Sequence, residues 1–148
     1  MGQQQLLLLV LATVIVGLAT VAGIQAFEQG SKRAEQDALT QTSVKIASDI
    51  QANLREPEQF GGAGMDKNGD YEGSSDAPSL GDLGYDTNSS NEYETAQGKC
   101  TVDSPGSLPI TVTCQSTESD GAKVEVEVQG LSSDEIKTVT QTFKDSGT

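Results

Sequence analysis

The stretch that decides the fold is LLLLVLATVIVGLATVAGIQAFEQGSKRAEQDAL, residues 6–39, in which an apolar run passes directly into a polar segment. Residues 6–24 carry no charged side chain, and about 18 or more such residues can span a bilayer as a helix. No proline occurs before Pro57, so we predict one continuous helix over residues 3–55. At 1.5 Å per residue this helix is about 80 Å long.

The two halves of the predicted helix differ in pattern. Residues 3–26 are apolar on every side, which predicts that lipid or protein surrounds them. Residues 27–56 are amphipathic, and their apolar positions recur mostly four residues apart, which predicts one stripe that packs on a small domain. The predicted stripe consists of Phe27, Ala34, Ala38, Thr42, Ile46, Ile50 and Leu54.

The helix is followed by an acidic region, residues 57–98, rich in Gly, Asp, Ser, Asn and Glu. Pro57 ends the helix, because the residue before a proline disfavours helical dihedral angles. The composition predicts loops with at most short strands or turns, and Leu80, Leu83 and Tyr85 are expected to dock them on the core.

Two candidate sites lie in this acidic region. The sequence MDKNGDYEGSSD, residues 65–76, places oxygen-bearing side chains at alternate positions around a turn. Ca²⁺ prefers six to eight hard oxygen ligands, so these side chains form a candidate calcium site, with a solvated Asn-Gly turn as the alternative. The candidate ligands are Asp66, Asn68, Asp70 and Glu72. Separately, Asn88-Ser89-Ser90 matches the acceptor pattern for N-glycosylation at Asn88.

Residues 99–148 are expected to form an antiparallel β-sheet of three or four strands. Segments 99–103 and 109–116 flank the turn-rich sequence SPGSLP, and KVEVEV at residues 123–128 alternates cleanly. The Thr-rich segment 135–144 favours a strand over the short helix that Ser132 and Glu135 could cap. The side chains expected on the inner face are Ile110, Val112, Cys114, Val124, Val126 and Val128, with Val139 and Phe143 sharing one face of the last strand. A long helix on such a sheet is an α+β fold.

The chain has two cysteines, Cys100 and Cys114, which flank the first predicted hairpin. A cross-strand disulfide would close a loop of about 15 residues and add roughly 3 kcal/mol in the chain-entropy model. That support matters for a thin core with 4% aromatic residues and no Trp. The disulfide implies an oxidising compartment, and the alternative is two free thiols.

Composition limits the possible functions. The net charge of −13 and the lack of Lys and Arg clusters argue against nucleic acid as a partner and against adsorption on anionic lipid. An acidic surface of this kind suits a high-salt habitat, or simply an acidic extracellular domain. The chain has no His and no nucleophile elbow, phosphate loop or metal-hydrolase motif, so we expect no catalytic residues and no enzyme activity.

A short leader ending in Gly2, a small polar start, about 20 apolar residues and a continuous amphipathic extension together resemble the type IV pilins and pseudopilins. The resemblance covers residues 1–55 well and the disulfide-bearing β region in outline. It implies a leader of residues 1–2 and processing by a prepilin peptidase between Gly2 and Gln3. Most bacterial pilins carry Glu at the fifth mature position, whereas this chain has Leu7 there, and the nearby polar residues are Gln3, Gln4 and Gln5.

The resemblance implies a structural subunit of an extracellular helical filament. Copies would form a homo-oligomer through residues 3–26, assembled by pilus machinery, after the subunit has been held in the inner membrane. The acidic domains would then lie on the cell-surface filament.

Two other hypotheses fit the same segment. The first is a single-span anchored extracellular binding module whose acidic loop takes up Ca²⁺ or meets a basic partner. The second is a secreted domain cleaved near Ile24. A minor pseudopilin of a secretion system would have much the same sequence as a pilin.

Overall fold

The computed structural model describes residues 2–65, 78–118 and 121–143. The chain divides into two compact units, residues 1–34 and residues 35–148. The elements are helix α1 (Gly2–Arg55), a 3₁₀ turn (Glu58–Phe60), strands β1 (Tyr93–Glu94), β2 (Gly98–Asp103), β3 (Ile110–Ser116) and β4 (Ala122–Val128), a second 3₁₀ turn (Ser133–Glu135) and strand β5 (Ile136–Phe143). The predicted end of the helix at residue 55 is confirmed.

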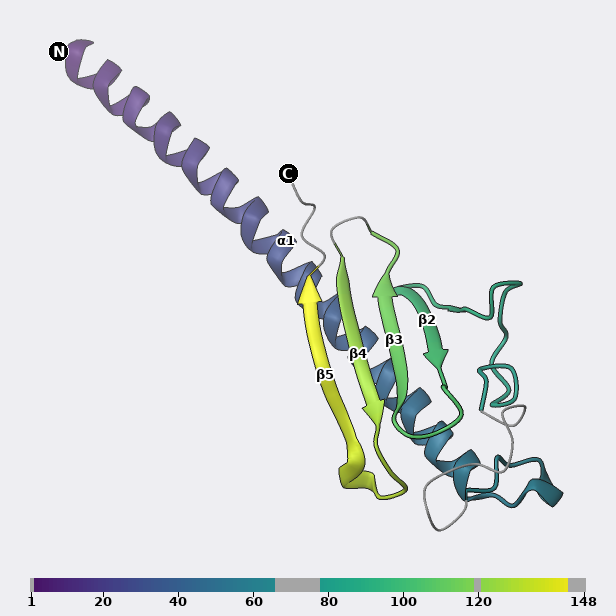
Figure 1. Ribbon diagram of the computed structural model, residues 1–148. Helices are drawn as coiled ribbons and strands as arrows, with labels where there is room; N and C mark the ends of the chain where they lie inside the picture. The colour runs from purple at the N-terminus through teal and green to yellow at the C-terminus, as the bar shows by residue number, and fades with distance from the viewer. Residues whose placement is uncertain (1, 66–77, 119–120, 144–148) are drawn as a thin grey trace. The chain divides into compact units, whose positions relative to one another are not determined.

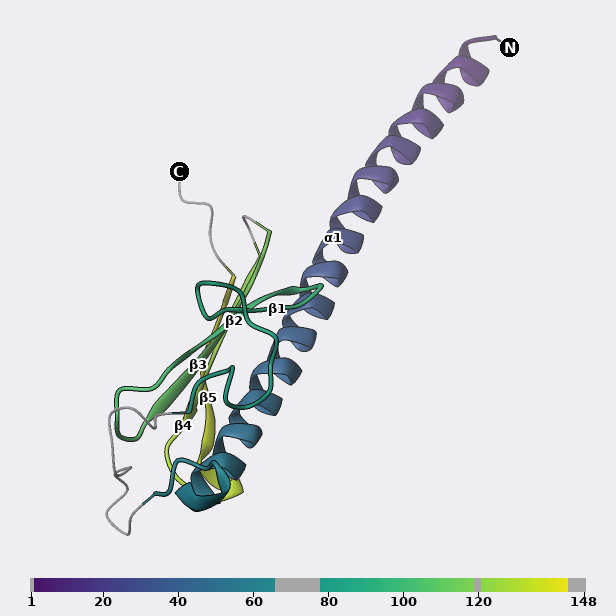
Figure 2. The ribbon, with the colours of Figure 1, turned by 90° about the vertical axis from the view of Figure 1, so that its right-hand side faces the viewer.

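The five strands form one antiparallel sheet in the order β1-β2-β3-β4-β5, so each strand pairs with its neighbour in sequence. Figure 1 shows β2, β3, β4 and β5 side by side in this order. Residues 35–55 of α1 lie against one face of this sheet, which confirms the predicted α+β fold (Figure 2). The sheet has more strands than the three or four predicted. The additional strand is β1, a two-residue segment within the acidic region whose short length gives little sequence signal.

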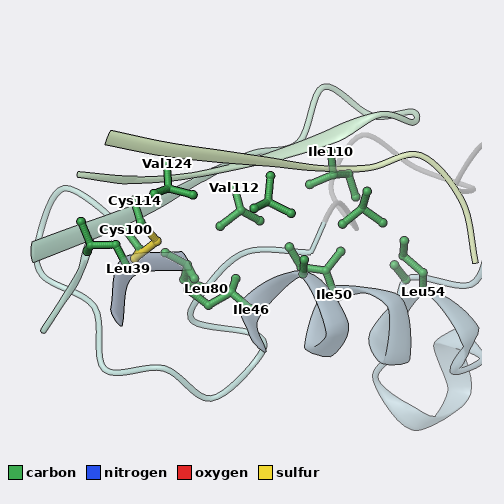
Figure 3. Packing of buried hydrophobic residues seen from close by; sticks show 14 of the residues in the cluster. Leu39, Ile46, Ile50, Leu54, Leu80, Cys100, Ile110, Val112, Cys114 and Val124 are labelled. Atoms are coloured by element: carbon green, nitrogen blue, oxygen red, sulfur yellow. A yellow bond between two sulfur atoms is a disulfide. The ribbon is translucent and has the colours of Figure 1, made fainter. Parts of the chain in front are cut away.

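The inner face of the sheet follows the predicted alternation. Strand β4 buries every second residue, and its Glu125 and Glu127 point to the opposite face. Figure 3 shows these apolar side chains facing those of the helix across a single layer. The side chains on the inner face of β2, β3 and β4 that are fully buried are Cys100, Ile110, Val112, Cys114, Val124, Val126 and Val128. Period-two alternation predicted this face because one side of the sheet is covered and the other is not.

The buried stripe of α1 begins later than predicted. It consists of Leu39, Ser43, Ile46, Ala47, Ile50, Gln51 and Leu54, whereas Phe27 is 81% exposed and Ala34 is exposed. A strict spacing of four residues advances about 40° around a helix at each step, because one turn takes 3.6 residues. Over the 27 residues from Phe27 to Leu54 that drift reaches the opposite face. The observed stripe combines steps of three and four residues and therefore stays on the side of the helix that faces the sheet.

The predicted disulfide is present. Cys100 and Cys114 lie directly opposite each other in the β2–β3 register, with 4.1 Å between their Cα atoms, and both are fully buried. Leu39 of the helix and Leu80 lie beside the sulfur atoms (Figure 3). Strands β2 and β3 also approach each other closely at Gly98, where a Cβ atom would lie 2.3 Å from the carbonyl oxygen of Gln115. The disulfide therefore fixes the end of the core where the helix begins to pack.

The other end of the core is held by hydrogen bonds from the helix. The Gln51 side chain is 5% exposed, and its Nε2 atom donates to the carbonyl oxygens of Gly130 at 2.7 Å and Ser132 at 2.8 Å. Arg55 Nη2 donates to the carbonyl oxygen of Leu131 between them. Three successive carbonyl groups of the β4–β5 connection thus accept hydrogen bonds from one turn of α1.

The last carbonyl groups of α1 are capped by the residues that follow it. The carbonyl oxygens of Asn53, Leu54 and Glu56 accept hydrogen bonds from the backbone N–H groups of Ala63, Met65 and Gly64, respectively. This return of the chain needs glycine, because a Cβ atom at Gly62 would lie 2.1 Å from the Glu56 oxygen. The sequence GGAGM at residues 61–65 therefore acts as the cap that the helix C-terminus needs.

Residues 78–94 dock on the core as predicted. Leu80 is fully buried, and Leu83 and Tyr85 pack partly buried against the cluster. Tyr85 Oη donates a hydrogen bond to Asp49 Oδ2 of the helix, and the Tyr85 ring meets Tyr93 edge to face at 4.8 Å between centroids. Burial, followed by the Asp49 hydrogen bond and charge, raises the pKa of Tyr85 well above its ordinary value.

The last strand departs from the prediction in one detail. Segment 136–143 is a strand, but Ser132 and Glu135 also bracket a 3₁₀ turn before it, with the Ser132 N–H donating to Glu135 Oε2 at 2.8 Å. Val139 is 51% exposed, because the β4–β5 register shifts between Glu125 and Val126 and leaves Val139 without a partner opposite it. An extra residue in one strand breaks the two-residue period that assigned Val139 and Phe143 to one face.

The disulfide makes a testable contribution to stability. We expect the double substitution Cys100→Ala with Cys114→Ala to lower the free energy of unfolding by about 3 kcal/mol, because the unfolded chain regains a loop of about 15 residues. Urea denaturation followed by circular dichroism measures this difference. A double variant as stable as the oxidised parent would show that packing alone holds the sheet.

Candidate functional site: the exposed apolar segment of α1

The apolar half of α1 is uncovered along its whole length. Every residue from Gly2 to Ser31 is exposed. Between residues 6 and 24, twelve Leu, Val and Ile side chains are 52–68% exposed, values that ordinary surface positions reach only singly. They are Leu6, Leu7, Leu8, Leu9, Val10, Leu11, Val14, Ile15, Val16, Leu18, Val21 and Ile24. An apolar surface this continuous marks a contact with lipid or with another protein.

The polar groups of this segment are satisfied within the helix. Thr13 Oγ1 donates to the Val10 carbonyl oxygen at 2.8 Å, and Thr20 Oγ1 donates to the Gly17 carbonyl oxygen at 2.8 Å. No charged residue occurs between Gln3 and Phe27. Because the backbone is helical and the hydroxyl donors of Thr13 and Thr20 are paired internally, residues 6–24 can leave water without losing hydrogen bonds.

One face of the segment is an exposed apolar strip that begins at Gln3. Its residues recur at intervals of three and four, so they all lie along one side of the helix. They are Gln3, Leu6, Leu7, Val10, Leu11 and Val14. Gln3 places a side-chain amide at the end of this apolar face, where a donor and an acceptor are both available.

Helix α1 is long and apolar enough to cross a membrane, judged by length and composition, and its most apolar 18-residue window is not buried at all. A membrane anchor is therefore compatible with the structure. The same length and composition are found in signal sequences near an N-terminus, so the helix alone does not distinguish anchoring from assembly.

Charge is distributed unevenly along the chain. Residues 28–55 of α1 hold four acidic and four basic side chains, so the whole net charge of −13 falls on residues 56–148. The apolar segment and the amphipathic half of the helix are thus electrically neutral in sum, and the part of the chain that contains the sheet is strongly anionic. This arrangement favours keeping the sheet in water while residues 3–26 are covered.

The remaining predicted site residues are placed as follows. Gly2 and Gln3 open helix α1, and nothing lies within 4 Å of the position of a Cβ atom at Gly2. The candidate calcium ligands Asp66, Asn68, Asp70 and Glu72 lie outside the described residues. Within the described ranges, no group of three or more His, Cys, Asp or Glu side chains is arranged to hold a metal ion.

Asn88, the candidate glycosylation residue, is half-buried next to Glu92 and Glu94. The sequence pattern marked it as an acceptor but missed its role in hydrogen bonding. An Asn that opens the turn before a strand is a signal for such a role, because its side chain readily bonds the backbone two residues on.

No protein-family model, curated protein or solved structure matches this chain. The assignment of function therefore rests on the chain's own residues. The structure has one long apolar N-terminal helix, a small antiparallel sheet and a Cys100–Cys114 disulfide, and all three are compatible with a pilin-like fold.

Deleting residues 1–34 tests whether the apolar segment alone drives association. The remaining unit, residues 35–148, retains the buried stripe, the sheet and the disulfide. We expect this fragment to be a monomer in water, because the twelve exposed apolar side chains are removed. The full chain keeps these side chains, so we expect it to require detergent. Size-exclusion chromatography with light scattering, and circular dichroism for folding, measure this. If the folded fragment still self-associates, the surface that drives association lies on the sheet unit, residues 35–148.

Proposed function

We propose that this protein is a structural subunit of an extracellular helical filament, similar to a type IV pilin. Its N-terminal helix holds the subunit in the membrane before assembly, and copies of residues 3–26 then pack together in the filament. The observation that carries the proposal is the uncharged helical segment whose apolar side chains are all exposed.

Physical chemistry requires this segment to be covered. Burying one Leu, Val or Ile side chain stabilises by about 1.5–3 kcal/mol relative to leaving it exposed, and twelve such side chains are exposed between residues 6 and 24. Lipid and the helices of other copies are equally apolar, so moving the apolar segment from lipid into a bundle of such helices gains little from the hydrophobic effect. Close packing between helices then decides the outcome, and small residues permit it.

The segment contains such small residues. Gly17 and Gly23 lie within the apolar run, and among the residues that the structure describes nothing lies within 4 Å of a Cβ atom placed at either position. Each glycine weakens the helix by roughly 1 kcal/mol relative to Ala, so close approach of a neighbouring helix is a physical reason for its presence. In the proposed filament, the amides of Gln3, Gln4 and Gln5 take the place of the Glu that most bacterial pilins carry at the fifth mature position.

The sheet unit supports the same proposal. A disulfide-bonded domain with a small core and a net charge of −13 on residues 56–148 is suited to the outside of a filament in an oxidising environment. The subunit then joins an apolar segment for the filament interior to an acidic domain for its surface. Processing between Gly2 and Gln3 belongs to this proposal, as does a pilus assembly machine.

The first test is electron microscopy of the sheared surface fraction of the source cells, labelled with an antibody to the sheet unit. We expect labelled filaments and a mature N-terminus at Gln3 by mass spectrometry. Single subunits left in the membrane pellet with an intact N-terminus would contradict the filament and favour the anchored binding module. A soluble chain starting near Ile24 would instead show a secreted domain released by signal peptidase.

Gly17→Leu separates helix packing from membrane insertion. The substitution keeps the segment apolar and favours the helix, and among the described residues nothing lies within 4 Å of a Cβ atom placed at Gly17, so we expect the subunit to fold and enter the membrane. We expect loss of filaments, because the added side chain keeps neighbouring helices apart. Val16→Leu, one position away, is the matched control and should retain filaments. Equal filament yields from both variants would show that helices do not approach closely at Gly17.

A further inference from the structure

The Asn88 side chain uses its full capacity for hydrogen bonds inside the protein. Its Nδ2 atom donates to Glu92 Oε2 at 2.9 Å and to Glu94 Oε1 at 3.2 Å. Its Oδ1 atom accepts from the backbone N–H of Ser90 at 2.9 Å and of Glu92 at 3.0 Å. A side-chain amide has two donor hydrogens and two acceptor lone pairs, so all four positions are occupied.

The backbone of the same residue closes the turn that leads into β1. The Asn88 N–H donates to the Glu92 carbonyl oxygen at 3.0 Å, and the Asn88 carbonyl oxygen accepts from the Asn91 N–H at 3.0 Å. Asn91 has a positive φ of 58°, a conformation that Asn tolerates in turns. Six hydrogen bonds therefore converge on Asn88, and they fix the chain just before Tyr93 enters the sheet.

The two carboxylates that Asn88 contacts also share a cation. Lys99 Nζ lies 2.9 Å from Glu94 Oε1 and 3.4 Å from Glu92 Oε2, and Glu94 faces Lys99 across the β1–β2 pair. The Asn88 hydrogen bond, followed by that of Lys99, lowers the pKa of Glu92. The Lys99 hydrogen bond, followed by that of Asn88, lowers the pKa of Glu94. Asn88 and Lys99 thus both contact the carboxylates of Glu92 and Glu94 and hold these two negative charges close together.

We propose that Asn88 is a structural residue of the β1 turn, and that a glycan on its Nδ2 atom and the native turn exclude each other. Asn88-Ser89-Ser90 matches the acceptor pattern, but an N-glycosidic bond replaces one Nδ2 hydrogen with a sugar carbon. At least one of the two carboxylate hydrogen bonds is then lost, and the sugar occupies the space beside Glu92 and Glu94. The folded protein therefore carries no glycan at this residue.

The chain offers a matched pair of variants, because Ser90 takes part in the Asn88 contacts only through its backbone N–H. Ser90→Ala and Asn88→Ala both abolish the acceptor pattern, but only Asn88→Ala removes the side-chain amide. We expect peptide mass spectrometry of the protein from the source cells to find Asn88 without a glycan. We expect Ser90→Ala to unfold like the parent, and Asn88→Ala to raise the unfolding equilibrium constant by about tenfold.

The pH dependence of unfolding gives a second readout. Because the pKa values of Glu92 and Glu94 are lowered in the folded protein, their contribution to stability is present above their ordinary pKa of 4.5 and is lost as the pH falls below it. Asn88→Ala should move the Glu92 pKa, followed by NMR, back towards 4.5, whereas Ser90→Ala should leave it unchanged.

Asn88→Asp provides a test if the alanine variant does not fold. It keeps the acceptor oxygen but replaces the amide donor with a third carboxylate, so we expect it to be less stable than the parent at neutral pH and to regain stability on mild acidification. Indistinguishable Asn88→Ala and Ser90→Ala variants would overturn the proposal. A glycan on Asn88 of protein whose Glu92 pKa is still lowered would overturn it too. Neither result depends on whether the protein forms filaments.

Discussion

The structure depends on the need to remove residues 6–24 of α1 from water. Twelve large apolar side chains occur in this stretch, and none is covered by the part of the chain that the structure describes. A helix is the conformation that satisfies all its backbone groups internally, so it suits both a bilayer and a bundle of identical helices. The same continuous helix then covers one face of the sheet in the small domain, because the sheet lacks enough large side chains to form a core by itself.

The small domain shows how a core is built with few aromatic residues. Its interior consists mainly of Val, Ile and Leu from one sheet face and one helix stripe, together with a buried disulfide. The disulfide lies at one end of this layer, and the hydrogen bonds from Gln51 and Arg55 lie at the other. Between them the β-branched side chains pack in a single layer, for which strands with strict alternation are well suited.

Much of this architecture could be predicted from the sequence, because it depends on local periodicity. Alternation in KVEVEV identified the inner face of β4, Pro57 marked the helix end, and the spacing of Cys100 and Cys114 indicated a cross-strand pair. The predicted start of the buried helix stripe was wrong, since residues spaced four apart drift around the helix. The exposure of Val139 was not predicted, because a register shift in an edge strand leaves no periodic signal.

The candidate sites were less predictable, because they depend on contacts between distant residues. The acceptor pattern at Asn88 is a property of three consecutive residues, whereas the hydrogen bonds of its amide depend on Glu94 of β1 and the position of Lys99 on β2. In the same way, the apolar run at residues 6–24 was evident in the sequence, but its complete exposure needed the structure.

The segregation of charge from apolar surface makes the protein comparable to an ionic surfactant. Residues 3–26 serve as an uncharged tail, and residues 56–148 serve as a headgroup with a net charge of −13. In such amphiphiles, repulsion between headgroups opposes the clustering of tails and acts over the Debye length, about 10 Å at 0.1 M salt and 3 Å at 1 M. If copies assemble as proposed, salt therefore sets how closely the heads can crowd and how strongly the assembly curves, and the concentration at which tails begin to cluster falls as salt rises.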